Sequence, residues 1–187
     1  MLSLFEIKPK KLLLSSSFDR TLIIWNMTTY ANEQTIKGEN VIYKFDFFPL
    51  IDNSIICGCK EKIIGLTISN EMKIETKEIL SATSIISFAL CKINTIVYSK
   101  GENSIIVYDM KEEKEVEQIT FNDKIKMIIK DDEYIILFGE EKNIYIINEE
   151  NYALVTKVYL NSIFSFNSVS LYNHSIYYNE DKRILQI

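Results

Sequence analysis

Short apolar runs separated by polar or charged turns follow one another along the whole chain. The clearest pair is Leu12–Leu14 and Leu22–Trp25, which are joined by a polar turn at residues 18–20. Two short apolar segments with a tight polar link predict an antiparallel β-hairpin. Later runs such as Ile105–Tyr108 and Tyr134–Phe138 are apolar without alternation, which is typical of strands covered on both faces. The pattern therefore predicts an all-β protein.

An acidic residue recurs between two apolar runs at nearly regular intervals: Asp19, Glu61, Glu102, Glu141 and Asp181. Successive members of this set of turn acids are 42, 41, 39 and 40 residues apart. Such a constant step predicts one supersecondary unit used repeatedly. We expect a single repetitive segment over residues 1–187, with units at about 1–38, 39–81, 82–122 and 123–161 and a partial one at 162–187.

In the stretch Leu12–Asn26, Ser15, Ser17 and Asp19 alternate along a strand into the turn, and Trp25 follows Asp19 by six residues. This stretch resembles a WD40 repeat. WD40 repeats typically carry a Ser-x-Ser-x-Asp turn and then an apolar strand that ends in Trp-Asp. Asn26 stands where that family usually has its second Asp.

A second, weaker match lies at Ser104–Met110, where Tyr108 and Asp109 stand in place of Trp-Asp. The resemblance implies a WD40-like β-propeller of four complete four-stranded blades plus a partial fifth, an open or incomplete ring within a larger propeller. Seven blades would need about 280–315 residues at the usual repeat length. Three explanations stay open: a piece of a longer protein, a ring completed by a partner, or a five-bladed ring with an imperfect seal. Open blade edges would favour self-association.

The resemblance also implies roles for individual residues. Ser15, Asp19 and Trp25 would form a structural hydrogen-bond network, which in the family includes a His from the preceding loop. The family's Gly-His dipeptide is absent before Leu4, so the network would be partial. The turn acids Glu61, Glu102, Glu141 and Asp181 occur once per repeat, which favours a structural role over a catalytic acid/base pair.

Composition narrows the classes of site. The net charge is −5 and the pI is near 5.1, which argues against a broad nucleic-acid surface. Cys57, Cys59 and Cys91 are an odd number for a disulfide framework and are interpreted as reduced core thiols. Cys57 and Cys59 would share one strand face, so a soft-metal site is the less favoured alternative. His174 is the only histidine, which disfavours a Ser-His-Asp triad and a zinc site.

No Gly-rich phosphate loop is present, so no cofactor is expected. No run of about 18 apolar residues indicates a membrane span, and the N-terminus does not read as a secretion leader. These features predict a cytoplasmic or nuclear protein.

The resemblance implies a non-catalytic protein–protein interaction scaffold, a WD40-repeat subunit of a eukaryotic multiprotein assembly, with protein partners of unknown identity. One alternative is a propeller that docks on phosphoinositide membranes, although Arg20 and Arg183 are the only arginines. Another is a propeller enzyme with an axial site. Candidate docking residues are exposed aromatic and basic side chains near strand ends, each of which is more often a packing residue. They are Phe18, Arg20, Tyr30, Phe48, Lys60 and Phe121.

Overall fold

The computed structural model describes residues 3–48, 54–69, 73–91, 94–160, 169–172, 175–178 and 184–186. The chain divides into two compact units. The first comprises Met1–Ile85 with Met110–Glu113, and the second comprises Ile86–Asp109 with Lys114–Ile187.

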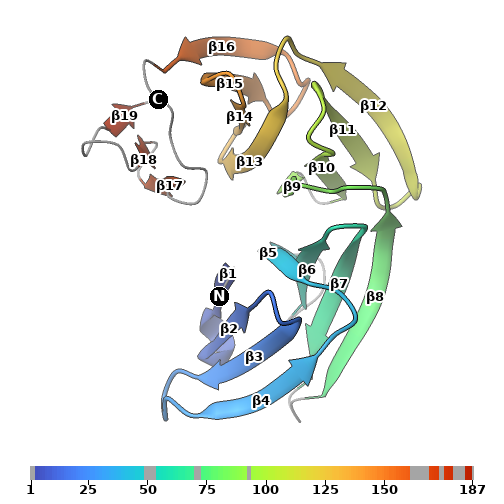
Figure 1. Ribbon diagram of the computed structural model, residues 1–187, viewed down its shortest axis with the longest axis vertical. Helices are drawn as coiled ribbons and strands as arrows, with labels where there is room; N and C mark the ends of the chain where they lie inside the picture. Colours follow the sequence, from blue (N-terminus) through green and yellow to red (C-terminus); the bar gives the residue numbers. More distant parts are fainter. Residues whose placement is uncertain are drawn as a thin grey trace. The chain divides into compact units, whose positions relative to one another are not determined.

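The first unit contains two antiparallel four-stranded sheets, each with its strands in sequence order (Figure 1). The first sheet consists of β1 (Ser3–Ile7), β2 (Leu12–Ser16), β3 (Thr21–Asn26) and β4 (Asn32–Lys37). The second consists of β5 (Ile42–Phe48), β6 (Ser54–Cys59), β7 (Lys62–Ile68) and β8 (Ile74–Ser81). A short 3₁₀ turn, Lys8–Lys10, follows β1 and contains Pro9, whose fixed φ suits the start of such a turn.

The second unit repeats this arrangement. Its first sheet consists of β9 (Ser87–Cys91), β10 (Thr95–Ser99), β11 (Ser104–Asp109) and β12 (Lys114–Thr120). Its second consists of β13 (Ile125–Asp131), β14 (Tyr134–Gly139), β15 (Asn143–Asn148) and β16 (Leu154–Tyr159). Three short strands form a further sheet, β17 (Val169–Tyr172), β18 (Ser175–Tyr178) and β19 (Ile184–Gln186). The prediction of an all-β chain with four complete four-stranded sheets is confirmed.

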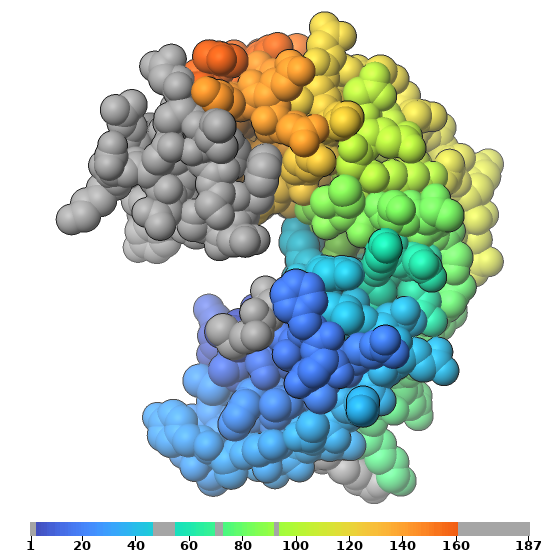
Figure 2. Space-filling view, in the orientation of Figure 1, coloured from blue at the N-terminus to red at the C-terminus, as the bar shows by residue number. Residues whose placement is uncertain are grey.

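The core of the first unit lies between its two sheets. In β2 the buried positions alternate, so that Leu12 and Leu14 face the neighbouring sheet while Leu13 does not. Leu14 joins one apolar cluster with Phe45, Cys57 and Leu66 of the second sheet. In Figure 2 the blue and cyan surfaces of these sheets meet directly. Because the sheets are held mainly by side-chain packing, the hydrophobic effect supplies most of their attachment.

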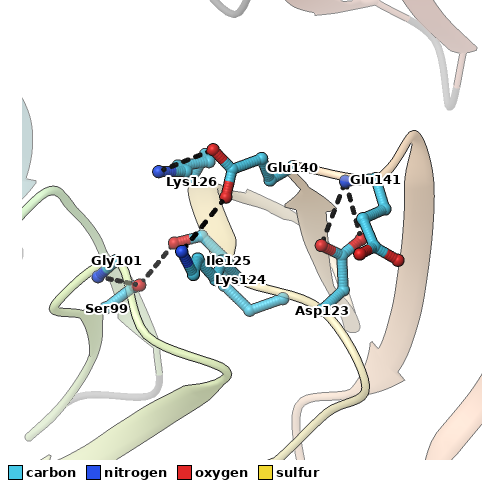
Figure 3. Close-up of polar contacts among 8 residues, drawn as sticks. All are labelled: Ser99, Gly101, Asp123, Lys124, Ile125, Lys126, Glu140 and Glu141. Carbon is cyan, nitrogen blue, oxygen red and sulfur yellow. Dashed lines mark hydrogen bonds and ion pairs between the residues drawn. The ribbon is translucent and has the colours of Figure 1, made fainter.

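In the second unit the inner strands β10, β11, β14 and β15 are buried almost throughout, as the unbroken apolar runs predict. One cluster joins its two four-stranded sheets. Two serines add direct hydrogen bonds between them. Ser99 Oγ donates to the carbonyl of Ile125 over 2.6 Å, and Ser87 Oγ accepts from Ile128 N over 2.9 Å. These bonds fix the register of one sheet against the next, and Figure 3 shows the bond from Ser99 to Ile125.

Candidate functional site

The turn acids lie at equivalent places in the four complete sheets. Asp19, Glu61, Glu102 and Glu141 all occupy the hairpin turn between the second and third strand, and all are exposed. Asp181 lies outside the described residues. Glu61 and Glu102 contribute their main-chain carbonyls, which accept from Ala82 N and Ile125 N. The four turn acids therefore share one position in the repeat, whereas their hydrogen bonds differ from sheet to sheet.

The structure brings together two of the three residues expected to form the hydrogen-bond network. Trp25 Nε1 donates to Ser15 Oγ over 2.9 Å, from β3 to the neighbouring strand β2. Asp19 does not join this bond, because it is exposed and accepts from the hydroxyl and the backbone N–H of Thr21 at 2.6 and 2.9 Å. The bond from the Thr21 hydroxyl is the main cause that lowers the pKa of Asp19. Asp19 therefore holds its own turn.

Replacing Ser15 by alanine is expected to lower the free energy of unfolding by about 0.5–1.5 kcal/mol, because the indole N–H loses its acceptor. Trp25 is the only tryptophan, so its fluorescence reports this site directly. We expect a red shift of the emission maximum as the unpaired indole turns toward water. Asp19→Ala serves as the control and should leave the emission unchanged. Equal shifts in both variants would contradict the pairing.

Asparagines cap the hairpin turns at the opposite end of two sheets. Asn26 Oδ1 accepts from Thr28 N and Thr29 N at 2.8 and 3.0 Å, so it closes the turn after β3. Asn148 does the same after β15, where its Oδ1 accepts from Glu150 N and Asn151 N at 2.8 and 3.2 Å. Both side chains form Asx-type turns. The departure from the family's Trp-Asp pattern at Asn26 therefore leaves a working cap.

Sequence reasoning missed a buried, hydrogen-bonded carboxylate of the second unit. Asp123 lies in the loop before β13, is only 5% exposed, and accepts from Glu141 N at 3.0 and 3.2 Å and from Asn143 Nδ2 at 2.8 Å. Its carboxylate occupies the space beside Gly139, where an added Cβ would lie 1.9 Å from Asp123 Oδ2. Figure 3 shows this carboxylate directed at the turn that carries Glu141. The signal available in the sequence was a glycine and an asparagine flanking a turn acid.

Other ionisable side chains also form structural contacts. Glu140 pairs with Lys126 at 3.4 Å and with Lys124 at 3.8 Å (Figure 3). Tyr98 is buried and its hydroxyl donates to Glu115 Oε1 over 2.5 Å. Burial, with the nearby carboxylate, raises the pKa of Tyr98 far above its usual range. The phenol therefore stays protonated and acts as a hydrogen-bond donor.

The three cysteines are free and buried. Burial raises the pKa of Cys59 to about 11, and burial followed by the charge of Cys59 raises that of Cys57 well above its ordinary value. Thiolates are the nucleophilic and metal-binding form, so both thiols are poorly suited to either role. Among the residues that the structure describes, no three His, Cys, Asp or Glu side chains are grouped to hold a metal ion. His174 and Arg183 lie outside the described residues.

The candidate docking residues fall into different environments. Phe18 and Tyr30 lie on turns and are 70% and 80% exposed. Arg20 and Lys60 are exposed. Phe121 is a core residue, with its ring 4.9 Å from that of Tyr145. The side chain of Phe48 is outside the described part of the structure.

Within the described residues, each unit has a concave surface. The first, here called the β4–β7 groove, has a volume of about 340 Å³ and runs between the two sheets of the first unit. It is lined mainly by aliphatic side chains, with charged residues around them. They are Leu22, Ile36, Ile42, Ile64, Leu66 and Ile74, with Arg20, Glu39, Lys62 and Glu78. The second is a shallow polar depression of about 470 Å³ above Asp123 and Phe121.

The described part of the chain contains no helix that is long and apolar enough to cross a membrane.

No protein-family model matches the sequence, and no curated protein matches it. Solved structures do match it. The β-propeller domain of Cps50 (Swd1) from Myceliophteria thermophila is 13% identical, with a TM-score of 0.73 over 99% of this chain and 72% of that one. The WD40 domain of Pan2 from Neurospora crassa is 11% identical, with a TM-score of 0.73 over 98% of this chain and 59% of that one. The chain thus spans less than two thirds of the Pan2 chain. These likenesses confirm the predicted β-propeller fold, and the four complete sheets correspond to blades of the kind that these two solved structures contain.

Proposed function

We propose that the chain is a non-catalytic scaffold that binds other proteins within a multiprotein assembly in the cytoplasm or nucleus. One observation carries the proposal: the blades use their polar groups to hold their own turns, while aromatic side chains stand exposed on those turns. Asp19 holds the turn that carries Phe18, and Asn26 holds the turn that carries Tyr30. Asp123 accepts hydrogen bonds from the β14–β15 turn. The buried free thiols are consistent with a reducing compartment.

Rigid turns are well suited to recognition, because ordering a flexible loop on binding costs conformational entropy. The Tyr30 turn illustrates this. Asn26 caps it through two side-chain bonds, and the main-chain N–H groups of Asn26 and Tyr30 close it further. Tyr30 is then presented at 80% exposure on a fixed backbone. A large aromatic side chain on such a support can supply anchoring area at low entropic cost.

Self-association through blade edges is part of the same proposal. Among the outer strands of the four complete blades, β16 carries the most exposed large apolar side chains. Leu154, Val155 and Tyr159 are each more than half exposed. Outer strands such as β12 instead carry charged side chains, which discourage edge pairing.

The proposal is tested by native affinity purification of the tagged protein from its own cells, followed by reconstitution with the purified proteins that accompany it in equal amounts. We expect at least one of them to form a stable binary complex with the chain. Sedimentation of the chain alone at several concentrations measures self-association separately. If the purified chain migrates with the mass of 21.8 kDa from its sequence and no accompanying protein binds it directly, the scaffold proposal is wrong.

A further inference from the structure

The β4–β7 groove is an apolar slot open to solvent. Leu22, Leu66 and Cys59 are buried at its base. Ile36 and Ile64 are only half-buried along its sides. Aliphatic side chains left partly exposed in a concave surface lower their free energy when another apolar group covers them. The volume of about 340 Å³ lies at the lower end of the range of about 300–1,000 Å³ found for ligand sites.

The rim of the groove is charged. Lys62 and Glu78 form an ion pair across neighbouring strands, with Nζ and Oε2 3.8 Å apart. Arg20 projects from the β2–β3 turn and is exposed. Within the described residues, no carboxylate forms an ion pair with its guanidinium. A guanidinium suits a carboxylate partner, because its planar donors match the two oxygens.

We propose that the β4–β7 groove binds a short extended segment of a partner protein, which inserts one bulky aliphatic or aromatic side chain and places an acidic residue against Arg20. This inference rests on the proposed scaffold function and names its docking site. A buried anchor surrounded by a polar rim is the arrangement that concentrates binding energy at protein interfaces. The apolar slot supplies most of the affinity, and Arg20 supplies the specificity for a segment with an acidic residue next to the anchor.

Two substitutions separate these contributions without removing core residues. Thr76 lines the groove from β8 and is exposed, so Thr76→Trp fills the slot from its edge. Arg20→Glu reverses the charge that faces the proposed carboxylate. Thr120→Trp is the matched control, because Thr120 is an exposed threonine on the outer strand β12 and does not line the groove.

The experiment selects dodecapeptides from a random phage-displayed library on the whole chain. Binding of the selected peptides, labelled with fluorescein, is then measured by fluorescence polarisation. We expect them to share a bulky apolar residue with an Asp or Glu within two positions. Affinity should fall at least tenfold with Thr76→Trp and about three- to tenfold with Arg20→Glu, and should be unchanged with Thr120→Trp. Thermal melting by circular dichroism checks folding, and Thr76→Arg replaces Thr76→Trp if that variant is unfolded.

Several results would overturn the inference. They are failure to select any peptide, equal affinity for Thr76→Trp and for the native chain, or an affinity that Arg20→Glu leaves unchanged. Concentration-dependent dimerisation that Thr76→Trp abolishes would identify the occupant as a second copy and would also overturn it. If the native chain forms its binary complex and Thr76→Trp forms it equally well, the groove assignment fails while the scaffold proposal stands.

Discussion

Replacing Gly139 by alanine is expected to lower the free energy of unfolding by about 2–4 kcal/mol. The added Cβ would lie 1.9 Å from Oδ2 and 2.5 Å from Cγ of Asp123, so the carboxylate must move. Once it moves, the part-buried Glu141 N and the buried Asn143 Nδ2 both lose their acceptor. Urea unfolding followed by circular dichroism measures the loss of stability, and hydrogen exchange at the Glu141 amide locates it.

A double-mutant cycle tests the cause. Asp123→Ala alone should lower the free energy of unfolding by about 2–3 kcal/mol, because the two donors are left unpaired. Combined with Gly139→Ala it should cost little more, since the clashing carboxylate is gone. Gly38→Ala is the matched control, because an added Cβ there makes only ordinary contacts, the nearest at 3.6 Å. Additive losses in the double variant would contradict the proposed contact.

Leu14→Ala is expected to lower the free energy of unfolding by about 3–4 kcal/mol, the cost of deleting a buried leucine and leaving a cavity. Leu14 is fully buried and contributes to the cluster that joins the first two blades. The loss should therefore appear in the unfolding transition of the first unit, which Trp25 fluorescence follows. Leu4→Ala, at a leucine of the same blade that is 50% exposed, should cost less than about 1 kcal/mol. Similar losses at both leucines would mean that the blades are not held by this cluster.

The sequence predicted the blades well because their signals are local. An apolar run and its turn lie within about ten residues, so the hairpin of β2 and β3 and the repeat step are visible directly. The contact between Ser15 and Trp25, which the WD40 resemblance implied, is also local, since the two residues are diagonal neighbours on adjacent strands. Asp19 was grouped with them by spacing, but a hydrogen bond to a residue two positions away competes successfully with a more distant one.

Features that depend on packing between distant segments were not predictable. Asp123 approaches Gly139 and Asn143 only after β13, β14 and β15 have paired. The β4–β7 groove requires two blades to lie side by side, so neither blade's sequence contains it. The sequence also could not distinguish the exposed Tyr30 from the buried Phe121, because both are aromatic residues beside strand ends.

The tight corners of the blades have a consequence for how this protein could be improved. Eight described residues other than glycine adopt left-handed backbone, among them Tyr30, Lys142 and Tyr152, while the chain contains five glycines in all. Side chains with a Cβ pay about 1 kcal/mol for that conformation. Substitution of these turn residues by glycine would remove the backbone strain and raise the thermal stability. The turns are therefore better places to stabilise the protein than the sheet interiors, which are already densely packed.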